Sequence, residues 1–215
     1  MQELIKKSKN ISYRETLTDK KANIIVNILS NSKSSAYIKS LIGEYKNCNK
    51  TEAIAAGFFS CEEIIGKTDA ELGWKRSANT LVLNDRIVIN GKVPMAVSEK
   101  GVFNRKLLEA LTKKFPTFDN NNITSILGIT NPKYNNESDL IYFHKIVTFI
   151  DCVYYGVLTE VDLEIISGII KSMLQKQIMS ELDISQSTIT KRIKRILAEL
   201  NLRKESDLVD LFLHK

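Results

Sequence analysis

The sequence predicts an α+β domain followed by an all-α domain of four helices. Between about Ala22 and Thr130, short β-rich runs such as "SAYIKSL" and "NITSILGIT" alternate with helical patterns and with turn signals such as "LIGEY" and "FDNNN". From Leu158 onwards, apolar residues recur only at helical spacing. We therefore expect an N-terminal extension (1–21), an α+β domain (22–132), a linker helix (133–157) and a helical domain (158–215).

The composition excludes several classes of protein. The most apolar window, 141–158, contains His144, Lys145 and Asp151, and each central charge would cost roughly 2.5 to 3.5 kcal/mol in a membrane span. The N-terminus "MQELIKKSKN" lacks the apolar stretch of a signal peptide, so we expect a cytoplasmic protein without a membrane partner. The chain has only two histidines, and its three cysteines match no zinc-binding spacing, so we predict no metal site.

A heptad pattern marks the linker. Its apolar positions alternate steps of three and four: Leu140, Phe143, Val147, Ile150, Tyr154 and Val157. The pattern is too short for a stable isolated coiled coil, so two interpretations stay open. The helix contributes to a homodimer that both flanking domains reinforce, or it packs on its own α+β domain.

The helical domain contains recognisable start signals. Thr159 followed by Asp162 is typical of a capping box. A short helical pattern from Leu174 to Leu182 precedes a break at Asp183, and Ser185 stands where the next helix should begin. A last helix is expected over 206–214.

The stretch "ISQSTITKRIKRIL" (184–197) separates its residue types by face. On a wheel of about 100° per residue, Ile189, Ile193 and Ile196 lie together on one side. Cations and small hydroxyl groups lie on the other side, and 185–198 contain no acid. Solvated helices usually interleave acids with bases, so the pattern favours an anionic partner over a merely solvated face. Overall charge cannot decide, because 158–215 contain nine basic and nine acidic residues.

Residues 158–213 resemble the four-helix LuxR-type (GerE-like) DNA-binding domain. The matching elements include Leu158-Thr159, Glu164, "KQI" (176–178), Ile184-Ser185 and Leu208-Val209. The resemblance implies double-stranded DNA as the partner, with base contacts from Thr190, Lys191 and Lys194 and phosphate contacts from Lys176, Thr188 and Arg192. Ser187 and Arg195 project from the same face and complete the predicted set, Arg195 as a backbone contact.

The LuxR family often has glycine where this chain has Ser172, Asp183 and Asn201. Asp and Asn tolerate a positive φ better than other non-glycine residues, so the turn at 183 and the helix end at 201 can survive. Ser172 fits well only if its position avoids the left-handed region.

Residues 36–131 resemble a PAS sensor domain. The matching segments are "EYKNCNKTEAIAAGF" with Asn49, "EEIIGKTDAEL", "NDRIVINGK" and "KKFPTFDNNNITSILGIT". The resemblance implies a sensory role and allows a small-molecule ligand of unknown identity. The absence of histidine from 1–143 argues against a histidine-ligated haem, and Cys48 lies outside the photoactive flavin motif. We predict no resident cofactor, no catalytic residue and no enzyme activity.

Together the two resemblances imply a bacterial transcription regulator. A PAS-like sensor domain would control a LuxR-type helix-turn-helix, and the protein would bind DNA as a homodimer. Region 4 of a sigma factor uses a similar helix-turn-helix, but the expected fourth helix favours the LuxR type. The alternative is a sensory or partner-binding protein whose C-terminal helices contact RNA polymerase or another protein instead of DNA.

Overall fold

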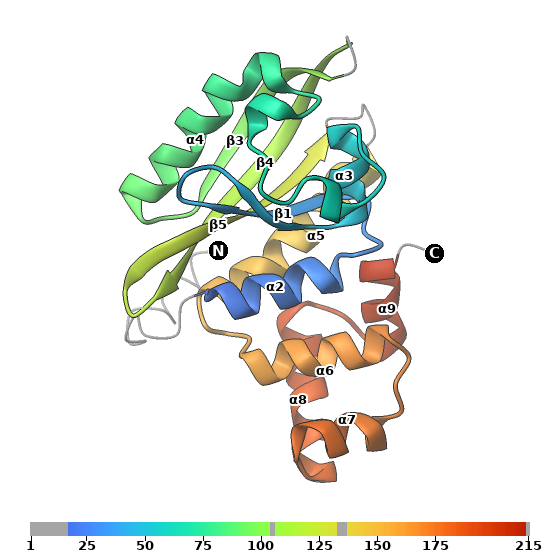
Figure 1. The fold of residues 1–215 in the computed structure, drawn as a ribbon. Helices are drawn as coiled ribbons and strands as arrows, with labels where there is room; N and C mark the ends of the chain where they lie inside the picture. Colours follow the sequence, from blue (N-terminus) through green and yellow to red (C-terminus); the bar gives the residue numbers. More distant parts are fainter. Residues whose placement is uncertain (1–16, 104–105, 133–136, 214–215) are drawn as a thin grey trace.

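The computed structural model describes residues 17–103, 106–132 and 137–213 (Figure 1). Its first part contains an antiparallel five-stranded sheet with the strand order β2-β1-β5-β4-β3. The strands are β1 (Ser35–Ser40), β2 (Tyr45–Cys48), β3 (Met95–Phe103), β4 (Lys106–Asp119) and β5 (Asn122–Pro132). The α+β prediction for this part is confirmed.

The turn between β4 and β5 explains why "FDNNN" forms a hairpin. Asn120 and Asn121 both have a positive φ, of 47° and 71°. A two-residue hairpin turn of this kind needs left-handed backbone at both positions, which asparagine tolerates. The hairpin sets the register that pairs Asp119 with Asn122 and Lys114 with Gly128.

The two faces of the sheet are covered by different helices (Figure 1). Helices α2 (Asp19–Ile28) and α5 (Glu137–Tyr154) lie on one face. Helices α3 (Lys50–Ala56) and α4 (Ala78–Gly91) lie on the other, with the 3-10 turns η2 (Cys61–Glu63), η3 (Asp69–Glu71) and η4 (Lys75–Ser77). Side chains alternate along β4, so Lys113 points to α5 and Lys114 to α4.

Helix α2 begins before the boundary that the sequence suggested at residue 22. Leu17 is fully buried, and Thr18 caps the helix by accepting a hydrogen bond from the Lys21 backbone. The Asp19 carboxylate accepts hydrogen bonds from Thr117 at 2.6 Å, from Thr124 at 2.9 Å, and from Ser125. Leu17 and Lys21 are therefore buried against the α+β domain, while Lys20 of the same turn stays exposed.

Helix α5 packs on its own domain. Phe143 and Ile150, two positions of the predicted heptad pattern, are buried within the chain. Lys113 Nζ lies 2.7 Å from the Asp151 carboxylate and ties β4 to the helix. Leu140, at the start of the pattern, is 43% exposed. The structure thus shows the second of the two interpretations of the linker, and a role in dimerisation stays a prediction.

The C-terminal part is all-α, as predicted. Its helices are α6 (Glu160–Ile170), α7 (Gln175–Leu182), α8 (Gln186–Glu199) and α9 (Glu205–Leu213). The capping box at Thr159 and Asp162 is present. Helix α6 packs on α2, and Phe212 of α9 meets Phe149 of α5 with ring centroids 4.9 Å apart. One continuous apolar core therefore joins this part to the sheet.

Over the residues described, the structure has no helix that is both long and apolar enough to cross a membrane.

Candidate functional site

The turn between α7 and α8 is built by local chemistry. Asp183 adopts the left-handed region with φ 51°, and the Ile184 backbone donates to the Met179 carbonyl at 3.1 Å. Ser185 then accepts a hydrogen bond from the Thr188 backbone at 3.2 Å and begins α8. The predicted break and the predicted N-cap are both confirmed.

Helix α8 has a buried face and an exposed face. Ile189, Ile193 and Ile196 are buried against the other helices of the domain. Because a helix turns by about 100° per residue, Thr190, Lys191 and Lys194 are carried to the solvent side. All three are exposed.

Three further predicted DNA-binding residues lie on α7 and in the first turn of α8. Lys176 on α7 and Ser187 on α8 are exposed, and Thr188 is half-buried. The hydroxyl groups of Ser187 and Thr188 each lie 2.9 Å from Ser185 Oγ, so they also support the helix start. Among the ion pairs of the described residues, none involves Lys176, Lys191 or Lys194.

The two arginines of α8 have intramolecular partners. Arg192 Nη1 donates to Asp162 Oδ1 at 2.9 Å and to Thr159 Oγ1 at 3.2 Å, and Arg195 donates to Asp162 Oδ2. The Asp162 side chain is completely buried. In the structure both arginines join α8 to the start of α6, and their predicted contacts with the DNA backbone stay a prediction. Arg192 and Asp162 are 30 residues apart, and Arg195 and Asp162 are 33 apart, so a local sequence pattern does not reveal these pairs.

Gln186 is a polar residue of the exposed face that sequence reasoning did not select. It lies in the first turn of α8, and its Nε2 is 3.4 Å from Thr190 Oγ1. Its spacing of four residues from Thr190 puts it on the same face of the helix, and this spacing is visible in the sequence. A glutamine amide can pair with the edge of adenine.

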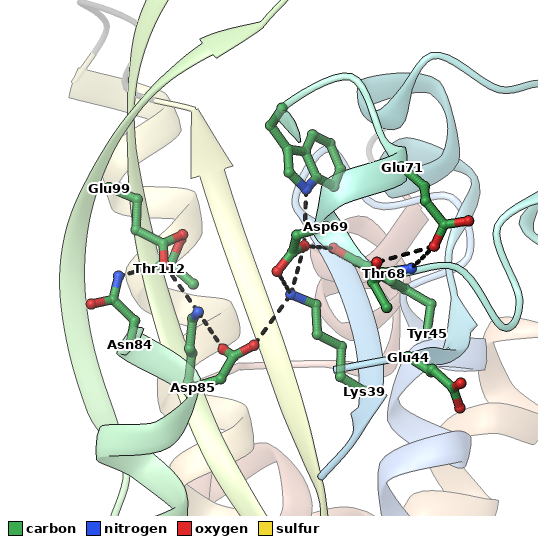
Figure 2. A network of polar contacts seen from close by, with 12 residues as sticks. Lys39, Glu44, Tyr45, Thr68, Asp69, Glu71, Asn84, Asp85, Glu99 and Thr112 are labelled. Atoms are coloured by element: carbon green, nitrogen blue, oxygen red, sulfur yellow. Dashed lines mark hydrogen bonds and ion pairs between the residues drawn. The ribbon is translucent and has the colours of Figure 1, made fainter. Parts of the chain in front are cut away.

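A second polar cluster fills the α+β domain between the sheet and α4 (Figure 2). Lys39 Nζ contacts both oxygens of Asp69, at 2.8 and 2.6 Å, and Asp85 Oδ2 at 3.3 Å. Lys114 Nζ contacts Asp85 Oδ1 at 2.6 Å and Glu99 Oε1 at 3.0 Å. Both lysine side chains are at most 2% exposed. Burial acts to lower the pKa of Lys39, but the charges of Asp85 and Asp69 outweigh it and raise that pKa.

Aromatic residues extend this cluster towards α3. Trp74 Nε1 and Tyr45 Oη each donate to Asp69 Oδ1 at 3.0 Å. Trp74 is buried, so its indole both packs in the domain and holds Asp69. Tyr45 Oη lies 3.3 Å from Glu52 Oε1. Burial raises the pKa of Glu52 to about 7.

Asn49 stands where the PAS resemblance placed its characteristic asparagine. Its Oδ1 accepts from the backbones of Ala36 at 3.1 Å and Glu52 at 3.0 Å, and its Nδ2 donates to the carbonyls of Leu29 and Ser34. The side chain therefore caps α3 and joins three segments of the domain.

The described residues contain no group of three or more histidine, cysteine or acidic side chains that could hold a metal ion.

No family model matches the chain. No curated protein matches its sequence. Solved structures do match. The Vibrio cholerae VqmA–ligand–DNA complex is 16% identical, with 88% of this chain and 85% of that chain covered and a TM-score of 0.47. A phage VqmA–DPO complex is 16% identical, with 90% of this chain and 88% of that chain covered and a TM-score of 0.49. The Rhodobacter sphaeroides LOV protein is 12% identical, with 86% of this chain and 96% of that chain covered and a TM-score of 0.50.

At these identities the likeness concerns the fold. The strand order, the capped helix after β2 and the helix along the sheet define a PAS-like domain. The four helices that follow include α7 and α8, which a short turn joins in a helix-turn-helix arrangement. The fold is therefore a PAS-like domain followed by a four-helix domain that contains a helix-turn-helix.

Proposed function

We propose that this protein is a bacterial transcription regulator that binds double-stranded DNA through α8, under the control of its PAS-like domain. In a helix-turn-helix, the second helix enters the major groove. Helix α8 occupies that position, begins at a well-formed cap and is fixed in orientation by its isoleucine face. We therefore infer that α8 is the recognition helix.

The observation that supports this function most is the exposed face of α8. Thr190, Lys191 and Lys194 are exposed there, and the two lysines form no ion pair within the described part of the chain. Free ammonium groups suit guanine edges and phosphates, and a threonine can contact several bases. Lys176 on α7 lies on the neighbouring helix, where helix-turn-helix proteins commonly touch the backbone.

Arg192 and Arg195 differ from the lysines of α8, because each has a partner within the protein. Because both are bonded to Asp162, DNA phosphates would have to compete with a buried carboxylate for them. We assign their main role to positioning α8, and the phosphate contacts to Lys176 and Thr188.

A homodimer fits this function. Two α8 helices related by a two-fold axis would read half-sites about 10 bp apart, one turn of the DNA helix. A bacterial regulator that binds chromosomal DNA acts in the cytoplasm, so we place the protein there.

The test is selection of DNA sequences by the purified full chain from a random library, followed by fluorescence anisotropy on the selected site. The double variant Lys191→Ala/Lys194→Ala should weaken specific binding by about 1 to 3 kcal/mol per lost base contact. The matched control Lys145→Ala/Lys204→Ala removes two exposed lysines outside α7 and α8 and should leave sequence preference intact.

Salt dependence separates this function from the alternative in which the helices contact RNA polymerase or another protein. Neutralising phosphates makes log K fall steeply with log salt, whereas a protein partner gives a shallow slope. Unchanged DNA affinity in the double variant, or failure to select any sequence, would contradict the proposal.

A further inference from the structure

The polar cluster between the sheet and helices α3 and α4 holds more acidic than basic groups. Two lysines, Lys39 and Lys114, are surrounded by the carboxyl groups of Asp69, Asp85, Glu99 and Glu52. The paired side chains are at most 11% exposed, and Glu52 is 4% exposed. If all four carboxyl groups were ionised, negative charge would remain uncompensated in a buried site, which is costly. A proton on one of them relieves this cost.

The hydrogen bonds indicate which carboxyl group takes the proton. Asp69 and Asp85 each contact a lysine directly, and Glu99 contacts Lys114 at 3.0 Å. Glu99 also accepts from Asn84 at 3.0 Å and from Thr112 at 2.8 Å (Figure 2). Within the described part of the chain, no lysine lies within ion-pair distance of Glu52.

The phenol of Tyr45 gives an independent argument by hydrogen count. Tyr45 Oη lies 3.0 Å from Asp69 Oδ1 and 3.3 Å from Glu52 Oε1. A phenol has a single hydrogen to donate, so it can satisfy only one of the two carboxyl groups. The nearer oxygen belongs to Asp69. An ionised Glu52 would then face the phenol oxygen with no hydrogen between them, whereas a protonated Glu52 can donate to it.

We propose that Glu52 is a proton-binding site of the PAS-like domain, occupied below neutral pH and emptied above it. On release, the carboxyl O–H bond breaks, the proton passes to water, and the buried cluster gains one negative charge beside Tyr45 and Asp69. The pKa of Glu52, which burial raises to about 7, agrees with this site. The titratable groups around it are Tyr37, Lys39, Tyr45, Cys48, Cys61 and Asp69.

The expected pH dependence follows from the direction of the shift. The folded protein holds the Glu52 proton up to a pKa of about 7, whereas the ordinary value is 4.5. The unfolded chain therefore loses this proton first as the pH rises. The stabilising contribution of the proton is complete below the unfolded value, decreases between the two values and is absent above the folded value.

The experiment compares wild type, Glu52→Gln and the surface control Glu181→Gln. The glutamine amide resembles the protonated carboxyl group and can donate to Tyr45 in the same way, so the variant should fold. Calorimetry from about pH 5 to about pH 8 should show that wild type and the control lose melting temperature as the pH rises. Glu52→Gln should lack this loss. An equal pH dependence in all three proteins would overturn the proposal.

Infrared difference spectra of the same proteins give a second readout that does not depend on stability. Wild type should lose a protonated-carboxyl band when the pH is raised from about 6 to about 8, and Glu52→Gln should lack that band. A wild type without such a band would also overturn the proposal. Neither measurement uses DNA, so the result stands apart from the success or failure of the DNA-binding proposal.

Discussion

Ser172 has a backbone conformation that conflicts with its identity. It adopts φ 59° at the end of α6, in the left-handed region that costs a residue with a β-carbon roughly 1 to 2 kcal/mol. Ser172→Gly should therefore stabilise the protein by about 1 kcal/mol. Urea denaturation measures the change in the free energy of unfolding.

A matched control has the opposite expected sign. Ser180 is also an exposed serine, but it lies inside α7. Ser180→Gly should destabilise the protein by about 0.5 to 1 kcal/mol, because glycine in a helix interior loses more conformational entropy. A destabilising Ser172→Gly would show that the serine side chain makes a contact worth more than its backbone strain.

At the scale of elements, Asp162 joins two helices. It accepts from the Thr159 backbone at 2.8 Å, which caps α6, and from both arginines of α8. Asp162→Ala should lower the free energy of unfolding by about 1 to 3 kcal/mol, because the cap and the charge-assisted hydrogen bonds are lost together. Glu160→Ala, in the same turn, removes a largely exposed pair with Lys20 and should cost less than about 1 kcal/mol. Thermal unfolding compares the two, and similar losses would contradict the assigned role.

The sequence predicted the elements well wherever a signal is local. The caps at Thr159 and Ser185 and the isoleucine spacing of α8 each involve residues of a single helix. Such signals can be recognised in the sequence without knowledge of distant contacts. The partners of Arg192 and the buried positions of Lys39 and Lys114 depend on contacts between distant segments. A lysine in a strand normally predicts an exposed side chain, and only the assembled sheet places Asp69 and Asp85 around these ammonium groups.

At the scale of the whole molecule, the PAS-like domain and the helix-turn-helix domain share one core. Helix α2 packs on both the sheet and α6, and Phe149 of α5 packs edge-on against Phe212 of α9. The Lys113–Asp151 pair and the contact of Phe115 with Tyr154, with ring centroids 5.8 Å apart, link β4 to the same helix. A change inside the PAS-like domain therefore has a continuous packed route towards α9.

This shared core predicts that the two domains unfold together. Phe149 is completely buried, so Phe149→Ala should cost about 3 to 5 kcal/mol, whereas Thr148→Ala, an exposed change on the same helix, should cost little. Fluorescence of Trp74, the single tryptophan, reports on the PAS-like domain, and amide exchange of α8 reports on the helix-turn-helix. Because both domains lose the same packing, the variant should shift both transitions equally. A shift confined to one probe would instead show that each domain has a core of its own and that α5 is only a tether between them.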